Sequence, residues 1–282
     1  MNVKRARNAI KTIGSIVSSS WSTRSVTVGY YLYDNFGDLL TPDILEYFGV
    51  RPFHCPNFRY AKAIGVGSLL HKVPDNYAGY FLGSGMIAAE RRKIPNAIPL
   101  LVRGRLTKEL LNCSSDTLVG DPGLIVDLVY SKFVAKEKIW DIGVVPHYSD
   151  LENDFVKRVL NDTSKLEALM IDVRKSPSEV VREISQCKMI VSSSLHGLIV
   201  SDSLGIPSCW LKVSDKILGG DFKFRDYYSC FGLDKRPIIP NEKYGLEQFL
   251  DKGQVTPTDS AMAIKHDIRL AYKTFARSVV DR

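Results

Sequence analysis

Cysteine and histidine are too few and too scattered in this chain to suggest a metal centre or a disulfide framework. The 282 residues include five cysteines and five histidines. No Cys-x-x-Cys pair occurs and the histidines have no clustered spacing, so the usual zinc and redox patterns are absent. We therefore predict no metal and no resident cofactor, and we expect reduced thiols, the usual state in the cytoplasm. The positions are Cys55, Cys113, Cys187, Cys209 and Cys230, and His54, His71, His147, His196 and His266.

Long apolar runs are missing as well. The run from Met189 to Ser201 is bounded by Lys188 and Asp202, and a helix that crosses a bilayer needs about 18 apolar residues or more. With 45% hydrophobic and 24% charged residues, the composition is typical of a globular protein. The sequence therefore predicts no transmembrane helix.

An excess of positive charge is found only near the N-terminus. Residues 1–24 contain five basic residues and no acidic one, which leaves 33 basic and 31 acidic residues in the rest of the chain. This balance argues against a surface that binds the phosphates of nucleic acid. The basic leader has two interpretations: an amphipathic helix that contacts an anionic membrane, or a frayed extension weakened by Gly14 and Ser18–Ser20.

Strand and helix patterns alternate from Ser25 onward, which is typical of an α/β fold with mostly parallel sheets. A chain of 282 residues is long for one core and suits two domains. We predict a leader over 1–24, Rossmann-like domains over 25–135 and 136–257, and a helix over 258–282 that packs across both. The expected strands cover 25–32, 63–66, 80–82, 99–102, 117–119, 140–145, 166–171, 189–191 and 208–211, and the segment 219–228 is expected to be a loop.

The stretch Ser192–Gly197 lies between an apolar run that predicts a buried strand and a helical segment that ends at Gly205 and Pro207. Serines at a strand end can cap the helix that follows, and helix N-termini favour anions in the crevice beyond the strands. His196 has a side chain that titrates near neutral pH. A capped helix whose histidine is satisfied by the backbone explains the same residues, so both interpretations stay open.

Other polar residues follow predicted strands and are candidates for the same crevice. Two arginines at one strand-to-helix turn, Arg103 and Arg105, favour a clamp for a carboxylate or phosphate. Ordinary loop chemistry and solvated charge are the structural alternative for the remaining candidates. Those candidates are Asn35, Asp38, Asp121, His147, Lys223 and Arg225.

Six short motifs occur in a fixed order along the chain. They are Asn-Phe-Gly-Asp at 35–38, Val-Arg-Gly-Arg-Leu-Thr at 102–107, Gly-Asp-Pro at 120–122, Gly-Val-Val-Pro-His-Tyr at 143–148, Ser-Leu-His-Gly at 194–197 and Leu-Gly-Ile-Pro at 204–207. The ordered set resembles the polysaccharide pyruvyl transferase family over most of the chain from Ser25 to Tyr228. The resemblance implies a glycosyltransferase-B-like pair of Rossmann-like domains with the site in the interdomain cleft. It also implies transfer of the enolpyruvyl carbons of phosphoenolpyruvate to sugar hydroxyls as a ketal.

The resemblance also implies roles for individual residues. His196 matches the histidine of the family's Arg-Leu-His-Gly pattern, and His196 and Arg103 are the implied catalytic residues. Ser194 stands where many members carry arginine, so Arg105, Lys223 or Arg225 would hold the donor's anionic groups instead. The implied donor-binding residues are Arg103, Arg105, Ser193, Ser194, Leu195, Gly197, Lys223 and Arg225, and the implied acceptor-binding residues are Asn35, Asp38, Asp121 and His147.

We therefore expect a cytoplasmic ketal pyruvyl transferase that acts on a hexose of an exopolysaccharide or capsule precursor. Its expected partners are phosphoenolpyruvate as co-substrate and an oligosaccharide or lipid-linked oligosaccharide acceptor, with no nucleic acid. The leader would hold the enzyme at the inner face of the plasma membrane. Two alternatives stay open: a nucleotide-sugar-dependent glycosyltransferase of the same architecture, and a sugar-binding relative that has lost catalysis. A glycosyltransferase commonly binds the ribose of its nucleotide sugar with a carboxylate, and no such residue is evident near Ser208–Leu211.

Overall fold

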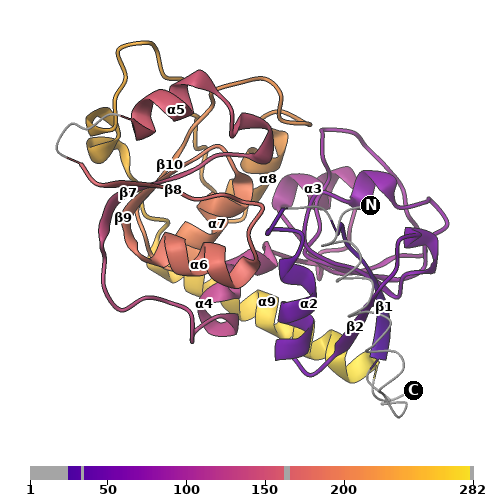
Figure 1. The fold of residues 1–282 in the computed structure, drawn as a ribbon. Helices are drawn as coiled ribbons and strands as arrows, with labels where there is room; N and C mark the ends of the chain where they lie inside the picture. The colour runs from indigo at the N-terminus through magenta and orange to yellow at the C-terminus, as the bar shows by residue number, and fades with distance from the viewer. Residues whose placement is uncertain (1–24, 33–34, 162–165, 280–282) are drawn as a thin grey trace, which may run out of the picture.

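Two parallel sheets organise the chain (Figure 1). The computed structural model describes residues 25–32, 35–161 and 166–279, so the predicted leader over 1–24 lies outside the described residues. The first sheet has six strands in the order β2-β1-β3-β4-β5-β6, and the second has four in the order β10-β9-β7-β8. Every pairing in both sheets is parallel. The predicted α/β class with parallel sheets is confirmed.

The strands form at short apolar runs between turns, close to where the sequence predicts them. The exception is β2 (Arg51–His54), which carries Pro52 and lies at the edge of the first sheet, where proline is tolerated. The rest of the first sheet is β1 (Ser25–Gly29), β3 (Ala63–Ile64), β4 (Tyr80–Leu82), β5 (Ile98–Val102) and β6 (Leu118–Val119). The second sheet is β7 (Trp140–Val145), β8 (Ala168–Met170), β9 (Cys187–Ser192) and β10 (Ser208–Trp210).

Helices connect most of the strands, and two of them differ from expectation. The helix α7 begins at Leu195, and its N-cap residue Ser194 makes no side-chain cap bond, so the predicted serine cap is wrong. The segment expected to be a loop is the helix α8 (Phe222–Ser229), which packs against α3. The helices are α2 (Leu40–Tyr47), α3 (Arg105–Leu110), α4 (Val126–Val129), α5 (Asp154–Leu160), α6 (Pro177–Ser185), α7 (Leu195–Ser203), α8 and α9 (Thr258–Ser278). Short 3₁₀ turns lie at η1 (Phe58–Tyr60), η2 (Leu70–Lys72), η3 (Pro122–Ile125), η4 (Tyr148–Asp150) and η5 (Glu247–Lys252).

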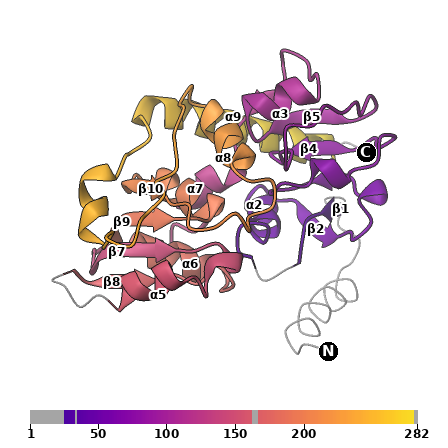
Figure 2. The ribbon, with the colours of Figure 1, turned by 90° about the horizontal axis from the view of Figure 1, so that it is seen from above.

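The C-terminal helix α9 packs against β4, β5 and β6 of the first sheet. Figures 1 and 2 show it in yellow as a long helix that leaves the region of the second sheet and runs past the first. Its Lys265 Nζ donates 2.8 Å hydrogen bonds to the Ser203 carbonyl in α7 and to the Asp127 carboxylate. The helix therefore has polar contacts outside the sheet that it covers.

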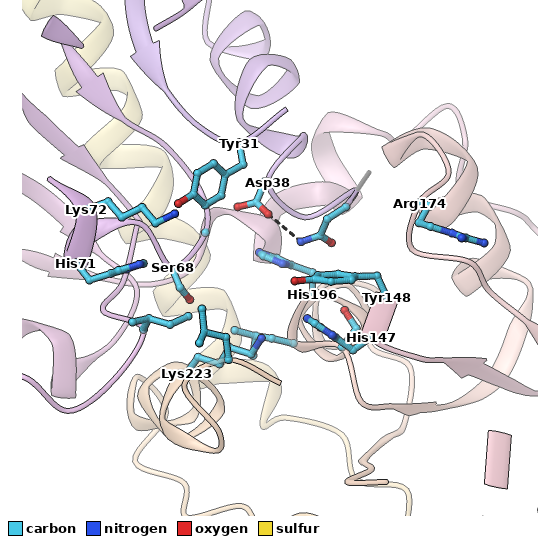
Figure 3. A pocket seen from close by; sticks show the side chains of 16 residues that line it. Tyr31, Asp38, Ser68, His71, Lys72, His147, Tyr148, Arg174, His196 and Lys223 are labelled. Atoms are coloured by element: carbon cyan, nitrogen blue, oxygen red, sulfur yellow. Dashed lines mark hydrogen bonds between the residues drawn. The ribbon is translucent and has the colours of Figure 1, made fainter. Parts of the chain in front are cut away.

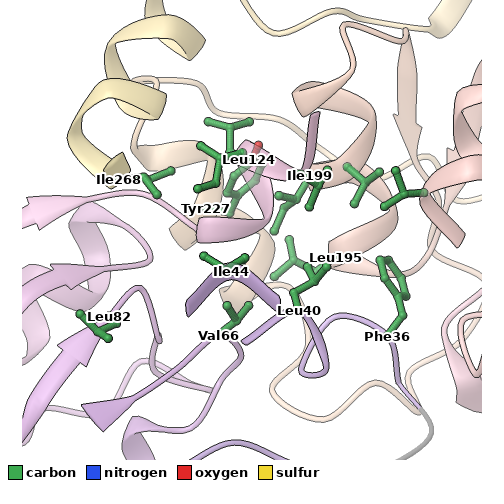
Figure 4. Close-up of a cluster of buried hydrophobic side chains, with 14 of the residues drawn as sticks. Phe36, Leu40, Ile44, Val66, Leu82, Leu124, Leu195, Ile199, Tyr227 and Ile268 are labelled. Carbon is green, nitrogen blue, oxygen red and sulfur yellow. The ribbon is translucent and has the colours of Figure 1, made fainter. Parts of the chain in front are cut away.

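One hydrophobic cluster runs from the first sheet to the second (Figure 4). Leu40 and Ile44 of α2 belong to the same cluster as Leu195 and Ile199 of α7, and all four are at most 4% exposed. A shared apolar interior resists relative movement of the elements that bury it, because interiors are close-packed. The loops at the ends of both sheets are therefore supported by one core.

The helices of the described ranges give no membrane-spanning candidate. None of those within 25–32, 35–161 and 166–279 combines the length and the apolar character that a bilayer crossing would need.

Candidate functional site

A cavity of about 580 Å³ lies where loops from the two sheets meet (Figure 3). Both polar and apolar side chains form its walls, and basic groups outnumber the single carboxylate. The lining residues are Tyr31, Asn35, Asp38, Gly67, Ser68, His71, Lys72, Ile87, His147, Tyr148, Arg174, Ser194, Leu195, His196, Leu218 and Lys223.

The winding of the sheets explains where the cavity is. The order of the strands reverses between β1 and β3 in the first sheet and between β7 and β9 in the second. Ligands of open parallel sheets bind beyond the carboxyl ends of the strands at such a reversal. Segments that follow all four of these strands line the cavity. The two sheets thus bring both of their expected ligand positions to one place.

His196 lies in the first turn of α7 and is 7% exposed. The Phe36 ring meets its imidazole edge to face, with the centroids 6.1 Å apart. Gly37 lies against the ring as well, because a Cβ at Gly37 would overlap Nδ1. Burial, with the charges of Lys223 and Arg103, lowers the pKa of His196 to about 3. The imidazole is therefore neutral at pH 7 when the cavity is empty.

Two carboxyl groups near His196 have raised pKa values. Burial raises the pKa of Asp38 to about 7, although Asn35 Nδ2 donates a 2.8 Å hydrogen bond to it. Burial also raises the pKa of Asp121 to about 6, against the opposing hydrogen bond from the Gly123 N–H. Strongly shifted groups that cluster beside a cavity are typical of functional sites.

Lys223 reaches the cavity from α8. Burial and the charge of Arg103 lower its pKa to about 8, so the ammonium is mostly charged at pH 7. Its Nζ lies 5.5 Å from the centre of the Phe224 ring. A buried lysine with a lowered pKa has incomplete compensation for its lost hydration. An anion in the cavity would supply that compensation.

Arg103 does not line the cavity, so its predicted placement on the wall is wrong. The residue is fully buried, and Nη1 and Nη2 donate 2.6 Å hydrogen bonds to Ser68 Oγ and the Met86 carbonyl. Its Nε donates to Asp226 Oδ2 at 2.9 Å. Because these contacts occupy the guanidinium, Arg103 supports the wall residue Ser68 and holds α8 through Asp226.

Several other predicted site residues lie off the cavity wall. Ser193 Oγ accepts the His147 N–H at 2.9 Å and donates to Asp150 Oδ2 at 2.7 Å, so it supports the wall from behind. Gly197 packs against Ser192 and Val145. The predicted residues outside the wall are Arg103, Arg105, Asp121, Ser193, Gly197 and Arg225, whereas those on it are Asn35, Asp38, His147, Ser194, Leu195, His196 and Lys223.

His147 lies on the wall as a neutral imidazole. Burial and the charge of Lys223 lower its pKa to about 4. The Ser149 N–H donates to Nδ1 at 3.3 Å, so Nδ1 is an acceptor and the ring proton is on Nε2. His147 can therefore donate one hydrogen bond to a ligand.

Sequence reasoning missed several polar residues of the wall. Ser68, His71 and Lys72 follow β3, and Arg174 follows β8. Lys72 Nζ lies 4.6 Å from the centre of the Tyr31 ring, and Arg174 makes hydrogen bonds to Asp172. The available signal was their position shortly after a predicted strand, the same signal that selected His147.

The described part of the chain gives no indication of a metal-binding site. There, no three or more histidine, cysteine, aspartate or glutamate side chains gather as a metal site would require.

The fold and the site define an α/β protein with two parallel sheets. Its cavity carries basic side chains and lies where the positions of strand-order reversal in the two sheets meet. The family model described as polysaccharide pyruvyl transferase matches residues 78–215, which include β4 to β10. The chain is 31% identical over 215 residues to the succinoglycan biosynthesis protein ExoV of Rhizobium meliloti (strain 1021), which covers 73% of this chain and 64% of that protein. The predicted resemblance to the polysaccharide pyruvyl transferase family is therefore confirmed.

Further similar proteins are more distant or uncharacterized. An uncharacterized protein of Acanthamoeba polyphaga mimivirus is 30% identical over 186 residues, which cover 64% of this chain and 62% of that protein. The chain thus matches less than two thirds of the length of either curated relative. The wall teichoic acid polymerase TagF has a TM-score of 0.45 at 11% identity, covering 100% of this chain and 97% of that chain. A functionally uncharacterized protein of Klebsiella pneumoniae has a TM-score of 0.42 at 12% identity, covering 82% and 98%.

Proposed function

We propose that this protein transfers the pyruvyl group of phosphoenolpyruvate to a hexose of a surface-polysaccharide precursor, as a ketal. The family match and the similarity to a protein named for succinoglycan biosynthesis support this class of reaction. The observation that carries the proposal is the buried Lys223 ammonium in the same cavity as His196. A fixed cation beside a proton-transfer group is what a small phosphorylated enol requires.

The donor is expected to bind near Lys223 and the start of α7. Phosphoenolpyruvate carries a carboxylate and a phosphate, and a lysine attracts either as a point charge. The cavity of about 580 Å³ lies within the range of roughly 300–1,000 Å³ that small-molecule sites occupy. Asn35, Asp38 and His147 line the same cavity and are proposed to bind sugar hydroxyls.

The proposed reaction is balanced without a further reactant. A proton adds to C3 of the donor, and the electron-deficient C2 accepts the oxygen of one sugar hydroxyl. The bond between C2 and the phosphate oxygen breaks, and the second hydroxyl closes the ketal at C2. Of the two hydroxyl protons, one replaces the proton delivered to C3 and the other leaves with the hydrogen phosphate.

His196 is proposed to deliver the proton to C3. Burial, together with the charges of Lys223 and Arg103, lowers its pKa while the cavity is empty. A bound trianionic donor offsets those positive charges, so the pKa of His196 rises when the substrate binds. The histidine then becomes protonated at the stage at which a proton donor is needed.

The test of the proposal is phosphate release from phosphoenolpyruvate that depends on an added oligosaccharide. We expect release by the full chain and a loss of about 10²–10⁴-fold in kcat for His196→Ala. Phe53→Leu, a change of a half-buried strand residue outside the cavity, serves as the matched control. Consumption of a nucleotide sugar instead would identify a glycosyltransferase, and turnover of neither would indicate a binding protein.

The remaining expectations extend this proposal. We propose a glycosyltransferase-B-like pair of Rossmann-like domains over 25–135 and 136–257 with the site between them, and a cytoplasmic location. Residues 1–24 are proposed to contact the inner face of the plasma membrane. Deletion of these residues is expected to reduce co-sedimentation with anionic vesicles, and unchanged co-sedimentation would contradict the membrane role.

A further inference from the structure

Two buried polar atoms near the cavity face each other without a hydrogen-bond partner. They are Asp121 Oδ2 and His196 Nε2, both unpartnered within the described residues. The two atoms are 3.8 Å apart, which is too long for a hydrogen bond and too short for a water to lie between them. Asp121 lies beyond β6 of the first sheet and is fully buried, so it does not reach the cavity.

We propose that Asp121 is a positioning residue that holds the proton of His196 on Nε2 and presents Nδ1 to the substrate. This inference rests on the proposed function, in which His196 protonates the donor. An approach of about 1 Å would bring the two atoms to hydrogen-bond distance. In this proposal Asp121 acts through His196, whereas the family resemblance implied that Asp121 binds the acceptor.

The other oxygen of Asp121 determines its orientation. Oδ1 accepts the Gly123 N–H at 2.9 Å, which leaves Oδ2 directed at the imidazole. At the other ring nitrogen, Nδ1 lies against Gly37, which carries no side chain, and His196 lines the cavity. A carboxylate behind one nitrogen of a ring that lines a cavity is the arrangement that orients a general acid–base histidine.

The charged groups around the pair come from several elements. Lys223 of α8 and Arg103 at the end of β5 face His196, and both disfavour the imidazolium. Arg103 and Asp226 of α8 act on Asp121, and Asp38 before α2 is also close enough to interact with it. Of these neighbours, Asp121 is the carboxylate nearest the unpartnered ring nitrogen, and it therefore favours a proton there.

The variant Asp121→Asn tests the pairing directly. The asparagine oxygen can keep the bond to the Gly123 N–H, which directs its NH₂ group at His196 Nε2. A donor at that position requires Nε2 to be an acceptor, so the ring proton moves to Nδ1. We expect nitrogen NMR of the full chain with labelled histidine to report an Nε2–H ring in the wild type and an Nδ1–H ring in Asp121→Asn.

Turnover of phosphoenolpyruvate supplies the second readout. We expect kcat to fall by about 10²-fold or more in Asp121→Asn with a smaller change in KM, because the wrong tautomer affects the proton transfer. The matched control is Asp202→Asn, which neutralises a carboxylate that is also buried but bonds Tyr227 and Thr256. That control is expected to leave the His196 tautomer unchanged.

Each outcome decides the inference. An Nδ1–H ring in the wild type, an unchanged tautomer in Asp121→Asn, or a changed tautomer with normal kcat would overturn it. The tautomer is measured without turnover, so it still tests the pairing if the wild type does not consume phosphoenolpyruvate. In that case the proposed function fails, and the NMR result alone decides whether Asp121 orients the ring.

Discussion

Replacement of Gly37 by alanine should displace the His196 ring. A Cβ at Gly37 would lie 2.5 Å from His196 Cε1 and closer to Cγ and Nδ1. Carbon atoms in contact are normally about 3.5–4.0 Å apart, so the ring must retreat by about 1 Å or more. Gly37 is not among the glycines with a positive φ, so the cost is steric.

The structure leaves the ring little room to retreat. Phe36 packs against its edge, and Asp121 lies 3.8 Å from Nε2. We expect Gly37→Ala to lower the free energy of unfolding by about 1–3 kcal/mol, the usual range for overpacking. A displacement of about 1 Å at a reacting group is expected to lower kcat by about 10²-fold.

Two assays check this prediction: urea unfolding for stability, and acceptor-dependent phosphate release for kcat. A double-mutant cycle with His196→Ala supplies the control, because removal of the imidazole leaves space for the added methyl group. We expect a coupling energy of about 1–3 kcal/mol between the two sites. Wild-type stability and kcat in Gly37→Ala, or additive effects in the cycle, would show that the ring does not need this space.

Three further predictions follow from the environment of the cavity. Lys223→Met should raise KM for phosphoenolpyruvate about tenfold or more, whereas Arg225→Met, an exposed change on the same helix, should leave KM unchanged. Because the pKa of Lys223 is about 8, the affinity of the wild type for phosphoenolpyruvate should also fall as the pH rises through 8. Asp226→Asn should lower the free energy of unfolding by about 3–5 kcal/mol in urea titrations, because Arg103 would keep a buried charge without its partner. Asp38 has a pKa of about 7 in the folded protein against 3.8 as its ordinary value, so folding favours its protonated form and ionisation opposes folding as the pH rises from about 4 to 7. The free energy of unfolding of Asp38→Asn should therefore increase by roughly 3–4 kcal/mol relative to that of the wild type over this pH range. If the free energies of unfolding of the two proteins changed in parallel with pH, this pKa would be contradicted.

Different walls of the cavity supply different functional groups. Residues after β9 and in α8 supply the imidazole and the buried ammonium, whereas residues after β1 supply Asn35 and Asp38. In the reaction that we propose, a donor held by one wall and an acceptor held by the other would meet at His196. Arg103 couples the two sides, because it bonds both Ser68 of the cavity wall and Asp226 of the helix that carries Lys223.

The elements that the sequence predicted best are those whose signal is local. The strand at 80–82 is observed with the predicted bounds, and so is the one at 140–145. The helix α6 begins at Pro177 after the capping residue Ser176, and Glu179 accepts the Ser176 N–H. Apolar runs and capping residues act within a few positions of each other, so they can be interpreted without a fold.

The helix α8 shows why other elements were missed. Its mixture of charged and aromatic residues has no clear amphipathic pattern, because Lys223, Phe224 and Asp226 are all buried. Asp226 bonds Arg103 and Thr107, residues more than 100 positions earlier. Partners that distant compensate buried charge only after the chain has folded, so the local sequence indicated a loop.

The sequence by itself determined the alternation of strands and helices, the parallel α/β class and the placement of polar residues after the strands, because each depends on neighbours along the chain. Tertiary structure alone decided which of those residues share a cavity. It placed Lys223, His71, Lys72 and Arg174 on the wall, and it turned Arg103 and Asp121 inward. The physical reason is that the charge and position of a side chain at this site depend on burial and on distant partners, which the winding of two sheets brings together.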